Sequence, residues 1–138
     1  MNKLKIILAD DAEILNRVKK DYLSKLDYID LVDVASNGYE EYQMIKSLQP
    51  DVAITDNQMP NMNGTDVIEK VTEDDEIKKK PLFIIVSADN LDNYAKENKE
   101  KNVFCAIRKG FDLDALNENI EDALFEIYNI LGGYHVKI

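Results

Sequence analysis

Hydrophobic residues are arranged along the chain in five short runs, and each run is followed by a segment in which they recur with helical spacing. Continuous apolar runs of this length are typical of parallel β-strands that are covered on both faces. We expect strands at residues 4–9, 31–35, 52–56, 82–86 and 103–107. We expect helices at about residues 14–26, 39–48, 65–73, 91–100 and 113–131, and in the first of them Ile14 and Val18 are among the hydrophobic positions that keep the helical spacing.

The strict alternation of five strands with five helices predicts an α/β fold, in which right-handed crossovers build a parallel sheet between two layers of helices. The chain has 138 residues, 45% of them hydrophobic, which is enough for the core of one domain. We therefore expect a single domain over residues 1–131. Gly132 and Gly133 should end the last helix, so that residues 132–138 form a short tail or the start of a linker.

Polar side chains follow four of the predicted strands. Asp10 and Asp11 follow the first strand, Asp56 ends the third, Ser87 follows the fourth and Lys109 comes after the fifth. Because ligands of parallel sheets collect at the carboxyl ends of the strands, we expect these groups to converge. Three carboxylates need a compensating cation, which Lys109 and a hard divalent ion such as Mg²⁺ could supply. The pattern indicates a site for carboxylate, Mg²⁺ and phosphate.

Charge and cysteine content exclude several other classes of function. The chain carries 27 acidic and 17 basic residues, for a net charge of -10, which argues against a direct nucleic-acid or anionic-membrane surface. A single cysteine excludes an internal disulfide and the clustered ligands of a zinc site. The apolar run near the N-terminus is too short for a signal peptide or a membrane span. We expect a cytoplasmic protein.

Taken together, these motifs resemble the response-regulator receiver family over nearly the whole chain, from about residue 4 to residue 131. The resemblance is carried by the acid pair Asp10-Asp11, the block from Asp56 to Gly64 with Met59-Pro60, the pair Ser87-Ala88, and Lys109 followed by Phe111 after one residue. It implies a flavodoxin-like, doubly wound (βα)5 fold with strand order 2-1-3-4-5.

The resemblance also implies the chemistry of the site. Asp56 would be the nucleophile that accepts a phosphoryl group from a phosphohistidine of a sensor histidine kinase or a phosphotransfer protein. Lys109 would pair with the phosphoryl oxygens, and Ser87 would turn its hydroxyl inward to bind them. The only reactions expected of such a protein are its own phosphorylation and dephosphorylation, so it is not expected to be an enzyme.

The metal site implied by the resemblance uses the same strand ends. Asp11 and Asp56 would bind Mg²⁺ through their side chains, and Gln58 through its backbone carbonyl. Asp10 would act largely through water.

Phosphorylation would switch the surface formed by the fourth helix, the fifth strand and the fifth helix, where receivers meet their partners. The resemblance implies a downstream target protein or a fused output domain as the partner, and it allows a homodimer on phosphorylation. Neither direct binding of nucleic acid by this domain nor membrane insertion is expected.

The chain departs from the family pattern at two positions near the fifth strand. Ala106 stands where receivers commonly have Tyr or Phe, and Phe104, which should face the same side of the strand, is a candidate substitute. Gly110 stands where proline usually follows a cis bond, so the Lys109–Gly110 bond is either trans or a costly cis bond without proline.

Three other interpretations remain open. A haloacid-dehalogenase-type phosphatase also uses an aspartyl nucleophile with Mg²⁺, but it needs a second acid two residues after the nucleophile, where this chain has Gln58. A degenerate receiver that binds partners without phosphorylation is compatible with Ala106 and Gly110. Asp10 and Asp11 could also serve only to cap the first helix.

Overall fold

The computed structural model describes residues 3–132. They form the alternating strands and helices that the hydrophobic pattern predicts, with boundaries within three residues of those expected and a short 3₁₀-helix in place of the end of the fourth helix. In chain order the elements are β1 (Leu4–Ala9), α1 (Glu13–Leu23), β2 (Ile29–Ala35), α2 (Gly38–Leu48), β3 (Val52–Asp56), α3 (Gly64–Glu73), β4 (Leu82–Ser87), α4 (Asp92–Glu97), η1 (Lys99–Lys101), β5 (Val103–Arg108) and α5 (Leu113–Ile130).

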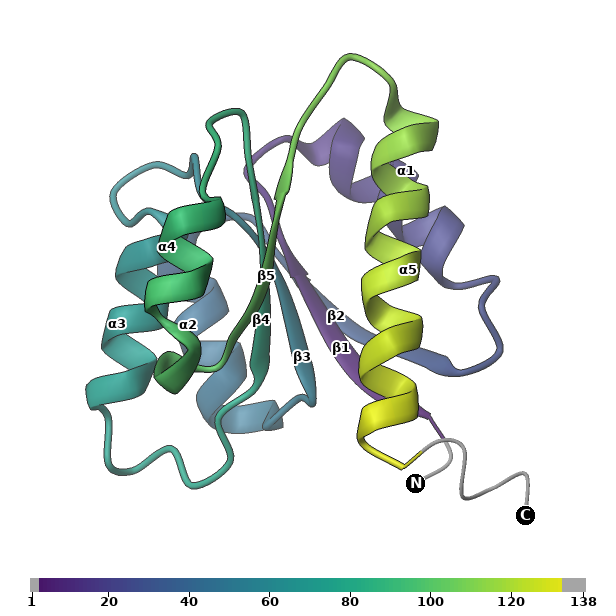
Figure 1. Ribbon diagram of the computed structural model, residues 1–138. Helices are drawn as coiled ribbons and strands as arrows, with labels where there is room; N and C mark the ends of the chain where they lie inside the picture. The colour runs from purple at the N-terminus through teal and green to yellow at the C-terminus, as the bar shows by residue number, and fades with distance from the viewer. Residues whose placement is uncertain (1–2, 133–138) are drawn as a thin grey trace.

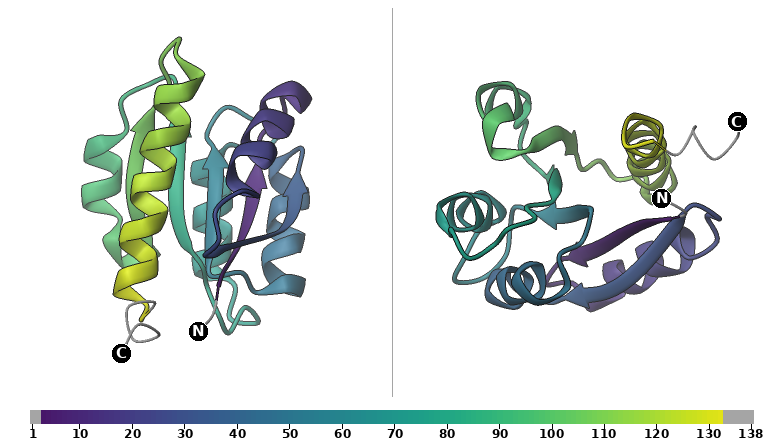
Figure 2. Two further views of the ribbon diagram at one scale, coloured as in Figure 1. Left: turned by 90° about the vertical axis from the view of Figure 1, so that its right-hand side faces the viewer. Right: turned by 90° about the horizontal axis from the view of Figure 1, so that it is seen from below.

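The five strands form one parallel sheet in the order β2-β1-β3-β4-β5, so the predicted flavodoxin-like fold is confirmed. Helices α2, α3 and α4 cover one face of the sheet, and α1 and α5 cover the other (Figures 1 and 2). The predicted tail begins at Gly132, which is the last described residue, and residues 133–138 lie outside the described part of the chain.

Successive side chains of the central strands enter opposite halves of the core, as the two-residue period of a strand requires. Ile6, Val52 and Ile54 pack with α5 on one face, whereas Ile7 and Ala53 pack with α2 and α3 on the other. Because both faces are covered, β3 is buried along its whole length. Its last residue is therefore held by a rigid scaffold.

Helix α1 does not present the face that its hydrophobic spacing suggests. Ile14 is 75% exposed and Val18 is also exposed, whereas Asn16 and Lys19 are buried together with Leu23. The prediction that the hydrophobic positions in the first turns of α1 form its buried face is therefore wrong. The polar residues turn inward because they have partners at the end of β1, described below.

Strand β5 contains a register shift that the sequence pattern did not reveal. Phe83 pairs with Val103 and Ile84 with Cys105, so that Phe104 is an extra residue in the pairing with β4. Phe104 consequently packs toward α5 while Ala106 packs toward α3 and α4, and the expectation that the two share one face is wrong. Phe104 cannot replace the missing aromatic side chain at Ala106. Between them lies Cys105, a partly buried free thiol.

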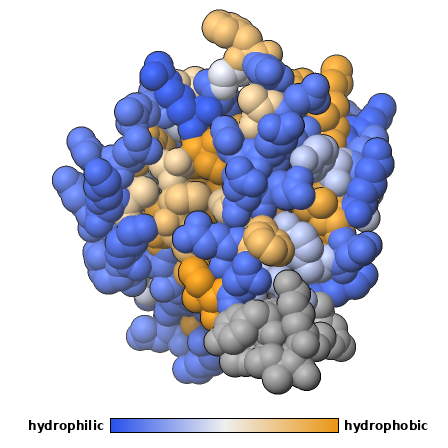
Figure 3. Space-filling model, turned by 45° about the vertical axis from the view of Figure 1, so that its right-hand side comes forward, coloured by the Kyte–Doolittle hydropathy of each residue, from blue (hydrophilic) through white to orange (hydrophobic). Residues whose placement is uncertain are grey.

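The face of the molecule shown in Figure 3 is predominantly hydrophilic, and hydrophobic side chains lie on it in separate patches. Phe111, in the loop between β5 and α5, is fully exposed. None of the described helices is both long enough and apolar enough to span a bilayer.

Candidate functional site

Three carboxylates meet at the carboxyl ends of two neighbouring strands. Asp10 follows β1 and Asp56 ends β3, and the two strands pair in register up to Ala9 and Thr55. Asp10 and Asp56 are 1% and 2% exposed, whereas Asp11 is exposed to solvent. One carboxylate oxygen from each of the three lies within 4.8 Å of the others. Clustered carboxylate oxygens are the donors that Mg²⁺ prefers, so these residues fit a hard divalent cation.

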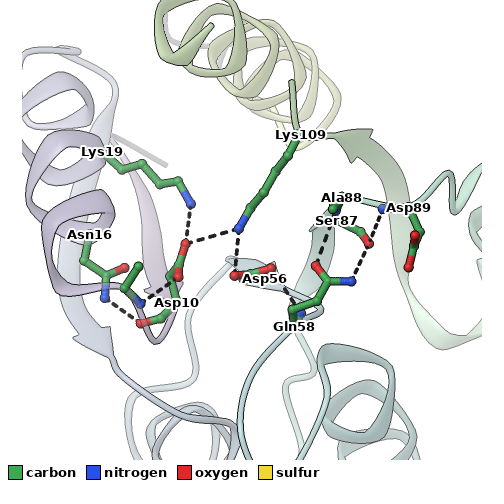
Figure 4. Close-up of polar contacts among 10 residues, drawn as sticks. Asp10, Asn16, Lys19, Asp56, Gln58, Ser87, Ala88, Asp89 and Lys109 are labelled. Atoms are coloured by element: carbon green, nitrogen blue, oxygen red, sulfur yellow. Dashed lines mark hydrogen bonds and ion pairs between the residues drawn. The ribbon is translucent and has the colours of Figure 1, made fainter. Parts of the chain in front are cut away.

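Lys109 reaches this cluster from the loop that follows β5 (Figure 4). Its Nζ lies 2.8 Å from Asp56 Oδ2 and 3.7 Å from Asp10 Oδ2. The backbone N–H of Lys109 donates a hydrogen bond of 2.7 Å to the carbonyl of Ser87, which fixes the start of the lysine on the end of β4. No peptide bond in the described residues is cis, so the Lys109–Gly110 bond is trans.

The two buried carboxylates differ in basicity. Burial raises the pKa of Asp56, the nearby charge of Asp10 adds to this, and the hydrogen bond from Lys109 compensates only in part. Burial also raises the pKa of Asp10, but the hydrogen bond from Ala12 and the charge of Lys19 outweigh it, so the net pKa lies below the ordinary value. Asp56 is thus the more basic carboxylate and Asp10 the more firmly ionised one.

Gln58 connects the loop after β3 to the loop after β4 (Figure 4). Its Nε2 donates to Ser87 Oγ over 2.9 Å, and its Oε1 accepts from Ala88 N over 3.3 Å. Ser87 Oγ also accepts from Asp89 N over 3.0 Å. At its own backbone, Gln58 N donates to Asp56 Oδ1 over 3.1 Å. The Ser87 hydroxyl oxygen is therefore engaged by Gln58 and Asp89 rather than by Asp56.

The loop between Asp56 and α3 is held by Asn57 and Gly64. Asn57 N donates to Val86 O, Gly64 N donates to Asn57 O, and Thr65 N donates to Asn57 Oδ1. A Cβ atom on Gly64 would lie 3.0 Å from Asp56 O and 2.9 Å from Thr55 Cγ2. Only glycine therefore lets the start of α3 approach the end of β3 this closely.

Two buried residues of α1 complete the surroundings of Asp10, and neither was predicted from the sequence. Lys19 Nζ lies 3.0 Å from Asp10 Oδ2, and Asn16 Nδ2 donates to Asp10 O over 2.7 Å. The signal that could have found them is the spacing of Asn16, Lys19 and Leu23, which places them on one face of the helix. Asp10 itself is not the N-cap of α1, because that position is Ala12.

A fourth carboxyl group, also missed from the sequence, lies beneath the site. Glu41 of α2 is fully buried and accepts a hydrogen bond from the hydroxyl of Thr55, the residue before Asp56. Its Oε1 has no hydrogen-bond partner. Burial raises the pKa of Glu41 to about 8.

The family model of the response regulator receiver domain matches residues 6–121. Chemotaxis protein CheY1 of Helicobacter pylori is 34% identical over 85 residues, which cover 61% of this chain and 68% of that protein. The protein-glutamate methylesterase/protein-glutamine glutaminase of Bacillus subtilis is 29% identical over 109 residues, or 79% of this chain.

The chain spans only part of some relatives. It covers 28% of the length of the Bacillus subtilis protein and 20% of a Methanococcus maripaludis protein of the same name. Among solved structures, the response regulator domain of Thermotoga maritima CheB superposes with a TM-score of 0.77 at 19% identity, covering 92% of this chain and 97% of that one. A chain of the CheX-CheY-BeF3-Mg²⁺ complex from Borrelia burgdorferi gives a TM-score of 0.70 at 19% identity, covering 86% of this chain and 87% of that one.

Proposed function

Because the chain belongs to the response regulator receiver family, we propose that Asp56 is its phosphoacceptor and that it acts as a signalling module in the cytoplasm. The observation that carries the proposal is the pairing of a buried, basic carboxylate with a lysine 2.8 Å away, at the end of a rigid central strand. A carboxylate with a raised pKa is the stronger nucleophile once it is ionised.

In the proposed reaction a carboxylate oxygen of Asp56 attacks the phosphorus of a phosphohistidine. A P–O bond forms as the P–N bond breaks, and the imidazole nitrogen of the donor leaves with the bonding electron pair and takes a proton from solvent. Such transfers depend mainly on positioning and on neutralising charge on the phosphoryl oxygens. Gln58 N and Lys109 Nζ hold the two oxygens of Asp56 in place before the reaction.

Lys109 serves the product as well as the acceptor. Its ammonium group is already beside Asp56 Oδ2 and would pair with a phosphoryl oxygen after transfer. Asp10, Asp11, Asp56 and the backbone carbonyl of Gln58 are the proposed ligands of Mg²⁺. When bound, the ion supplies positive charge that balances the phosphoryl oxygens.

Ser87 would act as the switch. In the structure Gln58 and Asp89 hold its oxygen, so turning toward a phosphoryl group at Asp56 would break the link from Gln58 and release Ala88. The loop that leads into α4 would then move. Since Ala106 is small, the change would leave through the backbone of this loop rather than through an aromatic side chain of β5.

The proposed partners follow from this chemistry. A sensor histidine kinase or phosphotransfer protein would donate the phosphoryl group, and the surface of α4, β5 and α5 would meet a downstream target protein or a fused output domain. Phosphorylation would also allow a homodimer to form, which light scattering of the phosphorylated chain would detect. We take residues 1–131 as the receiver and residues 132–138 as a tail or linker.

The test is phosphorylation by a small-molecule donor. Incubation with acetyl phosphate and Mg²⁺ should add one phosphoryl group per chain, measured by intact mass, and Asp56→Asn should abolish the addition. Asp30→Asn, at an exposed position of β2, is the matched control and should be labelled normally.

Two results would contradict the proposal. Multiple turnover of a chromogenic phosphomonoester would indicate a hydrolase with an aspartyl nucleophile. An unlabelled protein whose NMR spectrum also fails to respond to beryllofluoride and Mg²⁺ would indicate a receiver that works without phosphorylation.

A further inference from the structure

Lys19 is a buried lysine that no step of the proposed reaction uses. It lies on the inner face of α1, is 4% exposed, and its ammonium group lies 3.0 Å from Asp10 Oδ2. Burying a lysine is costly unless the charge is paired and hydrogen-bonded. The ion pair with Asp10 therefore keeps the positive charge of Lys19 next to the acidic cluster.

Asp10 has partners on both of its carboxylate oxygens. Oδ1 accepts from Ala12 N over 2.9 Å, and Oδ2 faces both Lys19 and, at 3.7 Å, Lys109. The hydrogen bond from Asn16 to the carbonyl of Asp10 ties the same residue to α1. The carboxylate is thus fixed in orientation, and much of its charge is neutralised before any cation arrives.

The charges at the strand ends can be counted in each state. Asp10, Asp11 and Asp56 bring three negative charges, and Lys19 and Lys109 bring two positive ones, so the resting cluster has one negative charge to offer a divalent cation. Without Lys19 it would have two. Phosphoryl transfer replaces the single negative charge of Asp56 by nearly two negative charges on the phosphoryl group. The cluster then attracts a divalent cation more strongly.

We propose that Lys19 is a positioning residue that weakens the binding of Mg²⁺ to the resting acidic cluster and thereby makes tight binding of the cation depend on the phosphoryl group. The inference rests on the proposed function, since it concerns the same metal site. Two resident ammonium groups, one from α1 and one from the loop after β5, hold the resting cluster near neutrality (Figure 4). A cation that arrives alone leaves the cluster with excess positive charge, whereas a cation that arrives with the phosphoryl group leaves it neutral.

The experiment is a calorimetric titration of the folded chain with MgCl₂, with and without beryllofluoride as a mimic of the phosphoryl group. Lys19→Met, which keeps an unbranched side chain of nearly the same length without its charge, should tighten Mg²⁺ binding to the resting protein by about tenfold, because a unit charge a few ångströms from the ion is removed. Lys20→Met, at the exposed neighbouring position, should leave the affinity within about twofold, since exposed charges are largely screened.

Beryllofluoride provides the second readout. It should raise the affinity for Mg²⁺ more in the wild type than in Lys19→Met, so the ratio of the two affinities falls in the variant. If Lys19→Met does not fold, Lys19→Gln, which can still donate to Asp10, takes its place, and Lys19→Arg should keep the wild-type affinity because it keeps the charge.

The possible failures are distinguishable. If the wild type, Lys19→Met and Lys19→Gln all bind Mg²⁺ with the same affinity, the proposed role of Lys19 is wrong. The proposed function would remain intact. Wild type and both neutral variants that all fail to bind Mg²⁺, even with beryllofluoride, would overturn the metal site and the inference together.

Discussion

Asp10 and Asp56 lie at the ends of neighbouring strands, yet their surroundings displace their pKa values in opposite directions. When the surroundings shift the pKa values of two neighbouring groups in opposite directions, the two groups commonly have different chemical roles. Here the more basic Asp56 suits the nucleophile. Asp10, which the amide of Ala12 and the charge of Lys19 keep ionised, suits a fixed negative charge.

Burial of Glu41 should make the stability of the protein depend on pH. Its pKa in the folded protein is about 8, against an ordinary value of 4.5. A carboxyl group whose pKa is raised by folding contributes stability that is fully present below its unfolded pKa and is lost as the pH rises through its folded pKa. The free energy of unfolding should therefore fall between about pH 4.5 and pH 8.

Glu41→Gln should remove this dependence, because the amide keeps the shape and the acceptor for Thr55 but has no proton to lose. We expect the variant to be more stable than the wild type at pH 8, by about 1–3 kcal/mol, and equally stable near pH 4.5. Urea unfolding at the two pH values measures the difference, and Glu97→Gln, at an exposed position, is the control. A constant difference between Glu41→Gln and the wild type across this range would contradict the assignment.

At the scale of elements, the connection between β3 and α3 carries the acceptor, and Gly64 allows the two elements to approach. Gly64→Ala places a Cβ against the backbone of Asp56 and should cost about 1–3 kcal/mol of stability, as overpacking does. Because the backbone at Asp56 must move, labelling by acetyl phosphate should slow as well. Urea unfolding and intact mass measure the two effects.

Gly110→Ala is the matched control for this prediction. No atom lies within 4 Å of the position that its Cβ would occupy, and its backbone is not left-handed. Its stability should stay within about 0.5 kcal/mol of the wild type. Equal destabilisation by the two substitutions would show that the close approach at Gly64 is not what requires glycine.

The elements also show where sequence patterns succeed and fail. The strands could be predicted because each contains a short run of hydrophobic residues. In β3 and β4 such a run is buried almost throughout, whereas the edge strands β2 and β5 are partly exposed. The inner face of α1 could not be predicted, because Asn16 and Lys19 are buried by partners at the end of β1 rather than by their own hydrophobicity. The extra residue at Phe104 depends on pairing with β4, which a single strand does not encode.

For the whole molecule, the order β2-β1-β3-β4-β5 brings the ends of distant segments together. The convergence of Asp10, Asp56 and Lys109 could be predicted, because every strand of a parallel sheet ends on the same edge. Three other features of the site could not be predicted: the role of the Gln58 side chain, the second lysine at Asp10, which is Lys19, and the carboxyl group of Glu41. Each depends on how loops and helices pack across the sheet rather than on the position of one residue along it.

The register shift in β5 also leaves the single cysteine of the sequence in a useful place. Cys105 is partly buried on β5, one of the elements of the proposed partner surface, and burial raises the pKa of its thiol to about 11. Since only the thiolate reacts, modification of the folded chain by a disulfide reagent at pH 8 should be on the order of 100-fold slower than in urea.

The Cys105 thiol is therefore a native chemical probe, whose rate of modification reports how often β5 opens. No residue needs to be added or removed before its reaction is followed by absorbance, and any treatment that loosens the edge of the sheet should speed the reaction up. If the rate of thiol modification changes when beryllofluoride and Mg²⁺ are added, the switch alters the structure of β5 on the proposed partner surface. Equal rates for the folded and unfolded chain would show that the strand gives Cys105 no protection.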